Sequence, residues 1–159
     1  MTVGVIADTH GILLPEALLA LQGSELIVHA GDVGPPSLLE ELETIAPVSA
    51  VYGNTDGEAL RAICPAERLV AAGAIRIGVI HGDRWPAHGR SEAMARHFST
   101  SRVQVVVYGH THRPLIETIR GVTLFNPGAA GKRTFGRKLS VGRLVIQGQD
   151  VKATVIPIE

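Results

Sequence analysis

The sequence predicts an α/β protein in which two β-sheets pack face to face and helices cover their outer sides. Over roughly the first two thirds of the chain, apolar strand-like runs alternate with helix-like runs. The last third instead carries short strand-like runs separated by turns, which is typical of antiparallel β structure. Because each sheet has an apolar face to bury, this combination favours two stacked sheets.

Apolar runs rich in β-branched residues predict buried strands at residues 3–7, 26–29, 48–52, 75–80 and 103–108. Each run is followed by a glycine-bearing or polar turn. Between the runs, apolar positions at helical spacing and helix-starting residues such as Pro15 and Ser37 predict helices. These helices cover residues 15–21, 36–45, 58–63 and 90–98.

Further strands are expected after Tyr108, at residues 115–119, 122–125, 139–146 and 151–158. Arg120-Gly121 and residues 147–150 are the turns that join them in pairs. The chain has no repeat of fixed period, no low-complexity tract and no linker. We therefore expect one domain over residues 1–159.

The composition excludes several classes of protein. Fifteen Lys and Arg residues balance fifteen Asp and Glu residues, so no extended nucleic-acid surface is expected. The single cysteine, Cys64, allows neither an intrachain disulfide nor a thiolate zinc site, and we expect it as a small buried hydrophobe in a reducing compartment. Without an apolar window of about 18 residues or a leader-like start, the sequence predicts a cytoplasmic protein with no membrane partner.

Metal-binding side chains follow the predicted strands, at the ends where α/β folds place their active sites. The candidate ligands are Asp8, His10, Asp32, Asn54, His81, His110 and His112. The i, i+2 spacing within Asp8/His10 and His110/His112 lets each pair face one site if these segments are extended. Seven ligands are too many for one ion but suit two ions that share a bridging carboxylate. Neighbouring glycines let the backbone approach a metal or phosphate closely.

In this order and spacing, the motifs D-x-H, G-D, G-N, H and G-H-x-H resemble the signature of the calcineurin-like metallophosphoesterases. The five blocks extend from Asp8 to His112. The short chain, the segment 29–32 and the turn 126–128 (Asn-Pro-Gly) also resemble the small YfcE-type phosphodiesterase branch of that family. The resemblance implies a four-layer α/β/β/α sandwich of two packed mixed sheets flanked by helices, in agreement with the strand and helix pattern.

The resemblance further implies how the ligands divide between two divalent metal ions. The implied sets are Asp8, His10 and His112 for one ion, Asn54, His81 and His110 for the other, and Asp32 as the bridge. Mn²⁺ is the expected metal, and imidazole and oxygen ligands also admit Ni²⁺, Zn²⁺ or Fe. The implied activity is hydrolysis of a small phosphodiester by a metal-bridging hydroxide, with all seven residues taking part in catalysis.

Three positions depart from the family pattern. Many members carry a histidine, assigned to the leaving group, where this chain has Thr55. A neutral hydroxyl cannot supply an imidazolium's proton near pH 7, so protonation falls to water, to a ligand or to a leaving group that needs little help. Asp83 replaces a frequent histidine and either orients a ligand, contacts a metal-bound water or faces solvent. Ala129 stands where relatives commonly have serine.

Other polar residues near the motifs admit a structural role as well as a functional one. His29 is expected to pack behind the site, and Asp56 either supports a ligand or caps the helix that begins at Glu58. Arg84 and Arg113 either contact substrate or are solvated. The basic segment 132–138 forms either a phosphate-contacting loop or an exposed hairpin. Its cations are Lys132, Arg133, Arg137 and Lys138.

Rival functions follow from the same residues. A protein-binding scaffold on this fold, as in the metallophosphoesterase-like retromer subunit, is expected to show degraded ligands, whereas all seven positions here hold competent residues. A phosphomonoesterase would share the site and differ in substrate. A nuclease would need an added domain or a broad basic face, which 159 residues with zero net charge do not provide. The sequence is compatible with a homo-oligomer and does not decide it.

Overall fold

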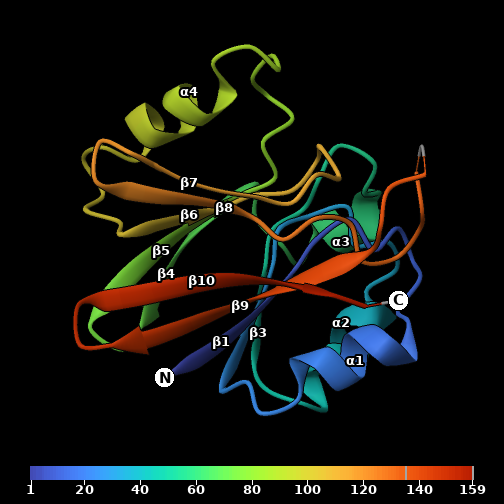
Figure 1. The fold of residues 1–159 in the computed structure, drawn as a ribbon. Helices are drawn as coiled ribbons and strands as arrows, with labels where there is room; N and C mark the ends of the chain where they lie inside the picture. The colour runs from blue at the N-terminus through green and yellow to red at the C-terminus, as the bar shows by residue number, and fades with distance from the viewer. Residues whose placement is uncertain (135, 159) are drawn as a thin grey trace.

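Two five-stranded sheets stack face to face in the structure, a computed structural model that describes residues 1–134 and 136–158 (Figure 1). The first sheet is ordered β10 (Asp150–Pro157), β9 (Ser140–Gln147), β1 (Thr2–Ile6), β2 (Leu26–His29) and β3 (Val48–Ala50). The second is ordered β4 (Glu67–Ala72), β5 (Ile75–Ile80), β6 (Val105–Val107), β8 (Val122–Asn126) and β7 (Leu115–Ile119). Residues 135 and 159, which the expected domain includes, lie outside the described residues; residue 135 also falls in the basic segment.

Helices cover the outer face of each sheet (Figure 1). The first sheet carries α1 (Pro15–Leu21), α2 (Ser37–Glu43) and α3 (Glu58–Arg61), and the second carries α4 (Arg90–His97). Leu21, Leu42 and Leu60 pack from the three helices onto the first sheet, and Met94 packs from α4 onto the second. The predicted four-layer α/β/β/α sandwich is therefore confirmed.

Strand β1 illustrates why the central strands are continuous apolar runs in the sequence. Val3 and Val5 lie in the core between the two sheets, whereas Ile6 lies in the core beneath the helices, and all three are fully buried. A strand with both faces covered has no solvent side and needs no polar alternation. Burying each side chain of this size contributes about 1.5–3 kcal/mol.

Strand β4 is an element that the sequence pattern does not predict. It pairs with β5 in antiparallel register, from Glu67 opposite Ile80 to Ala72 opposite Ile75. Because β4 is an edge strand, only Val70 and Ala72 are buried along it. An apolar signal of two residues is too short to distinguish a strand from a loop.

The β-rich last third does not form a sheet of its own. The hairpin β7–β8 joins the second sheet, where β8 runs parallel to β6, and the hairpin β9–β10 extends the first sheet through antiparallel pairing of β9 with β1. The mostly antiparallel pairing expected for this region is therefore observed, in both hairpins and between β9 and β1, while β8 also pairs in parallel with β6. The pattern along the chain cannot reveal which sheet a hairpin joins.

The topology brings five strand ends together. β1, β2 and β3 are parallel, so the loops that follow them lie side by side, and the same holds for β5 and β6 in the other sheet. Contacts between the β2 loop and the end of β5 join the two groups of loops, since Asp32 lies 3.2 Å from His81. All predicted ligands thus come from loops at this one end of the sandwich.

Candidate metal centre

The backbone bends sharply at most of the predicted ligands. Seven described residues other than glycine have positive φ angles, and five of them are candidate ligands. These are Asp8 (53°), His10 (47°), Asp32 (52°), His110 (68°) and His112 (56°). The expectation that the two pairs lie in extended segments is therefore wrong: left-handed bends direct the side chains. Such conformations are unfavourable for side chains with a Cβ, and they concentrate at functional sites.

One group of ligand atoms comprises Asp8, His10 and His112, whose ligand atoms all lie within 4.8 Å of one another. Nε2 of His10 and Nε2 of His112 are 3.2 Å apart, and Nε2 of His112 is 3.5 Å from Oδ1 of Asp8. The Nδ1 atoms face hydroxyls, of Thr55 at 3.4 Å and of Thr134 at 3.1 Å. If each Nδ1 donates to its hydroxyl, both Nε2 lone pairs point at the same place, as a shared cation requires.

A second group comprises Asp8, Asp32 and His81. Nε2 of His81 lies 3.2 Å from Oδ2 of Asp32, 4.0 Å from Oδ1 of Asp8 and 3.1 Å from Oδ1 of Asn54. Nδ1 of His81 donates to the carbonyl oxygen of Ala30 at 2.8 Å, which fixes the ring so that Nε2 faces the carboxylates. Asn54 therefore adds an amide oxygen to this group.

Asp8 is common to both groups and is completely buried. Its Oδ1 accepts the backbone N–H of His110 at 3.2 Å, whereas its Oδ2, also shielded from solvent, has no hydrogen-bond partner. A buried carboxylate oxygen without a donor is unfavourable by several kcal/mol unless a cation neutralises it. The donor set of carboxylates, an amide and imidazoles, together with this oxygen, fits divalent metal ions.

The electrostatics around Asp32 favour a positive charge at the centre. Burial alone raises the pKa of this carboxyl, but the hydrogen bond and charge interaction with His81 and the N–H of Thr55 hold it well below its usual range. Burial alone lowers the pKa of His81, but the carboxylates of Asp32 and Asp8 raise it above the ordinary value. Oδ2 of Asp32 also lies 3.8 Å from Nε2 of His10, so this carboxylate faces ligands of both groups, as a bridging residue does.

His110 is the predicted ligand that belongs to neither group. Its ring lies beside that of His81, with centroids 5.2 Å apart. Burial, with further contributions from His81 and Arg90, lowers the pKa of His110 below its ordinary value. A lowered pKa favours the neutral imidazole, which is the form in which histidine binds a metal.

The buried side chains of Asp56 and His29 hydrogen-bond to the loops that follow the strands of the first sheet. Asp56 accepts N–H groups from Val33, Gly34 and Gly53 at 2.8–3.1 Å, and α3 has no side-chain cap, so of its two expected roles the support of the ligand loops is the one observed. His29 accepts the N–H of Gly31 at its Nδ1 and contacts the hydroxyl of Thr9 at 2.9 Å with its Nε2.

The leading glycines of two motifs, G-N and G-H-x-H, make room for a carboxylate rather than for a metal. A Cβ on Gly53 would collide with the side chain of Asp32, and a Cβ on Gly109 would lie 2.9 Å from Oδ2 of Asp8. Side chains at these two positions would displace the acidic ligands. These two glycines therefore leave space for the acidic ligands, whereas the sequence suggested that they leave space for the metal or phosphate itself.

The structure also shows where several residues outside the two ligand groups lie. Asp83 is exposed and lines a cavity with Asn54 and Arg84, and its carboxylate acts electrostatically on the predicted ligand His110. Of the basic segment, Arg137 lines a second cavity beside His110, while its three other cations are exposed. Thr134, which contacts His112, is a supporting residue that no sequence motif marks. Cys64 is buried as expected, and burial raises the pKa of its thiol.

Comparisons with known proteins agree with this geometry. A model of the calcineurin-like phosphoesterase superfamily domain matches residues 1–149. A probable metallophosphoesterase of Methanothermobacter thermautotrophicus is 39% identical over 134 residues, which cover 81% of this chain and 77% of the relative. A Methanocaldococcus jannaschii protein named phosphodiesterase is 29% identical over 141 residues, covering 80% and 83%. Vps29 of Entamoeba histolytica, solved in complex with Zn²⁺, has a TM-score of 0.78 at 22% identity over all of both chains, which shows a shared fold.

The two-sheet sandwich and its buried carboxylates and imidazoles define a metal-binding hydrolase. Since the family model matches most of its length, the chain belongs to the calcineurin-like phosphoesterase superfamily. Across the described residues, every helix is too short or too polar to cross a bilayer.

Proposed function

We propose that the protein is a phosphodiesterase that hydrolyses small phosphodiesters with two divalent metal ions. The observation that carries the proposal is the buried carboxylate of Asp8, which belongs to both ligand groups and keeps one oxygen without a donor. The relative named phosphodiesterase supports the diester over the monoester as substrate. We further propose Mn²⁺ as the metal, with Ni²⁺, Zn²⁺ and Fe as alternatives for this ligand set.

The ligand roles follow the two groups. Asp8, His10 and His112 would hold one ion, His81 and Asn54 with His110 the other, and Asp32 would touch both. Bound there, two cations would stabilise negative charge on the phosphate oxygens and lower the pKa of the attacking water. The hydrogen bond to the carbonyl oxygen of Ala30 orients the ring of His81, and the N–H of Thr55 orients the carboxylate of Asp32.

Thr55 has a positioning role in this proposal. Its backbone N–H donates to Oδ1 of Asp32 at 2.9 Å, and its hydroxyl lies 3.4 Å from Nδ1 of His10. One residue thereby orients a ligand in each group. A hydroxyl of ordinary acidity does not protonate a leaving group at neutral pH, so substrates with stable leaving groups suit this site.

Hydrolysis of bis(p-nitrophenyl) phosphate and of p-nitrophenyl phosphate tests the proposal. Metal-stripped protein should recover activity when Mn²⁺ is added, with the diester cleaved faster than the monoester. The Asp32→Asn variant, which keeps the shape of the side chain but removes its charge, should lose metal and activity together. A preference for the monoester would identify a phosphomonoesterase, and a chain that binds no metal and cleaves neither ester would support the scaffold.

A further inference from the structure

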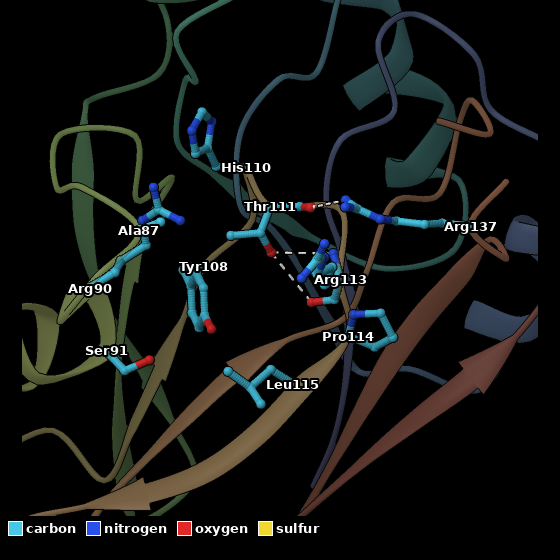
Figure 2. A pocket seen from close by; sticks show the side chains of 10 residues that line it. All are labelled: Ala87, Arg90, Ser91, Tyr108, His110, Thr111, Arg113, Pro114, Leu115 and Arg137. Atoms are coloured by element: carbon cyan, nitrogen blue, oxygen red, sulfur yellow. Dashed lines mark hydrogen bonds between the residues drawn. The ribbon is translucent and has the colours of Figure 1, made fainter. Parts of the chain in front are cut away.

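A cavity of about 600 Å³ lies beside His110, on the second-sheet side of the candidate metal centre (Figure 2). Three arginines from separate segments line it: Arg90 at the start of α4, Arg113 after β6, and Arg137 in the segment before β9. None of the described residues that line the cavity is acidic, although the whole chain has no net charge. The volume is that of a small-molecule site, and its lining is strongly cationic.

Two of these guanidinium groups are anchored by backbone carbonyls. Arg90 donates from Nε and Nη2 to the carbonyl oxygen of Trp85, at 3.1 and 2.9 Å, and Arg137 donates from Nη1 to that of Thr111 at 2.6 Å. A carbonyl contact holds the side chain of Arg90 without neutralising its charge. Binding an anion between anchored arginines therefore requires less loss of side-chain entropy than ordering them from solution.

Helix α4 adds a weaker favourable potential. Its first residues, Arg90 and Ser91, line the cavity, and the position before them, Gly89, provides no side-chain cap among the described residues. The N–H groups of a helix N-terminus favour negative charge. The rest of the wall includes the apolar side chains of Pro114 and Leu115 and the ring of Tyr108, which suit the carbon skeleton that joins two charged groups (Figure 2).

We propose that this cavity binds a terminal phosphate carried on one ester arm of the substrate, so that the preferred substrates are phosphodiesters bearing an additional phosphomonoester. A phosphomonoester carries a charge of about −1.5 to −2 at pH 7, and arginine binds its oxygens in pairs. His110 both lines the cavity and lies beside His81, so one molecule can reach from the centre into the cavity. The inference rests on the proposed function, because the scissile diester must occupy the adjoining centre.

The cavity on the opposite side of the centre is less suited to this group. It measures about 260 Å³ and contains the carboxylate of Asp83 with Arg61 and Arg84. Arg61 donates to the carbonyl oxygens of Asp56 and Gly53 at 2.7 and 3.4 Å. An acidic side chain and a smaller volume disfavour a dianion there, so the terminal phosphate is assigned to the side of His110.

A pair of dinucleotides that differ by one phosphate tests this inference: pApA, which carries a 5′-phosphate, and ApA, which does not. With Mn²⁺ present, kcat/KM for pApA should exceed that for ApA by about 10- to 100-fold, the range of one or two charge-assisted hydrogen bonds. Arg113→Ala should bring this ratio close to one. The matched control Arg84→Ala removes an arginine of the opposite cavity and should keep the ratio. Equal kcat/KM for the two dinucleotides in the unaltered protein would overturn the inference.

Binding to the metal-free protein separates this inference from the proposed function. Calorimetric titration without metal should show pApA binding at least about 10-fold more tightly than ApA, and Arg113→Ala should remove the difference. Selective binding of pApA without hydrolysis of either dinucleotide under any metal would overturn the phosphodiesterase and support the cavity. Hydrolysis of both at equal kcat/KM, with equal binding, would overturn the cavity and support the phosphodiesterase.

Discussion

The two sheets contribute chemically different parts of the candidate metal centre. Loops of the first sheet supply the carboxylates and the amide, from Asp8, Asp32 and Asn54, whereas the second sheet supplies imidazoles, from His81, His110 and His112. Charged oxygens attract any divalent cation, and imidazoles favour transition metals over Mg²⁺ or Ca²⁺. The first sheet adds only one imidazole, His10, and the second adds no carboxylate or amide, so the mixed ligand set forms only where the two sheets pack together.

The loops are also held by different means. In the first sheet, the ionisable carboxyl of Asp56 accepts three backbone N–H groups. In the second, the neutral amide of Asn126 donates to the carbonyl oxygen of Gly109 at 2.8 Å and accepts the N–H of Gly128 at 2.9 Å. Hydrogen bonds to a charged group are about twice as strong as neutral ones. The oxygen-rich side should therefore be the more rigid part of the centre.

The largest expected effect is the loss of activity on replacing Asp8, compared with the smaller loss on replacing His110. Asp8→Asn removes the charge common to both ligand groups, and kcat/KM for bis(p-nitrophenyl) phosphate should fall about 10³-fold or more, because several kcal/mol of charge stabilisation is lost with the metals. His110→Gln changes a residue outside both groups and should lower it by about 10- to 100-fold. Steady-state kinetics and metal content per chain measure both. Equal losses in the two variants would contradict the division between the sheets.

The stability of the metal-free protein should depend on pH through His29. Burial, with nearby His81 and His10, lowers the pKa of His29 from 6.5 to about 3. Because this pKa is lower in the folded than in the unfolded state, the unfolded state takes up the proton first as the pH falls. The contribution of His29 to the free energy of unfolding is therefore complete above pH 6.5 and decreases towards pH 3, by roughly 4–5 kcal/mol at most. Urea unfolding at a series of pH values measures it. His29→Asn keeps an acceptor near Gly31 and cannot titrate, so an equally steep loss in this variant would exclude His29 as the cause.

Asp56 and Asn126, which hold the loops of the first and second sheet, should contribute differently to the free energy of unfolding. Asp56→Ala leaves three backbone N–H groups without an acceptor and should lower the free energy of unfolding by about 3–5 kcal/mol, whereas Asn126→Ala should lower it by about 1–3 kcal/mol. Urea unfolding at pH 7 compares them, with Asp150→Ala at an exposed position as the control. A larger loss for Asn126→Ala would reverse the assignment of the more rigid side.

A modest effect is expected from the stabilisation by the metal itself. Ligands from both sheets mean that a bound cation joins the sheets, and a concentration 100-fold above its dissociation constant should add about 2.7 kcal/mol. For a chain of this size that corresponds to a rise in Tm of roughly 5–10 °C. Thermal denaturation with Mn²⁺ and with EDTA measures the difference. A rise that persists in Asp8→Asn would show that the metal binds elsewhere.

The sequence determined which candidate ligands the centre contains, because each of them lies next to a strand end, within a short motif. The strands β1, β2 and β5 were predictable for a related reason, since burial on both faces leaves a continuous apolar run. The edge strand β4 was not, because only two of its side chains are buried. The role of Thr134 was also not predictable from the sequence, since it contacts His112 from 22 residues away along the chain and belongs to no motif.

Only the tertiary structure decided how these parts combine. It assigned β7–β8 and β9–β10 to different sheets, bent the backbone at Asp8 and His10 into left-handed conformations, and made the carboxylate of Asp8 common to two ligand groups. It also placed Arg90, Arg113 and Arg137 around one cavity. The physical reason is that short motifs record local chemistry, whereas distances between loops of two sheets depend on how the sheets pack.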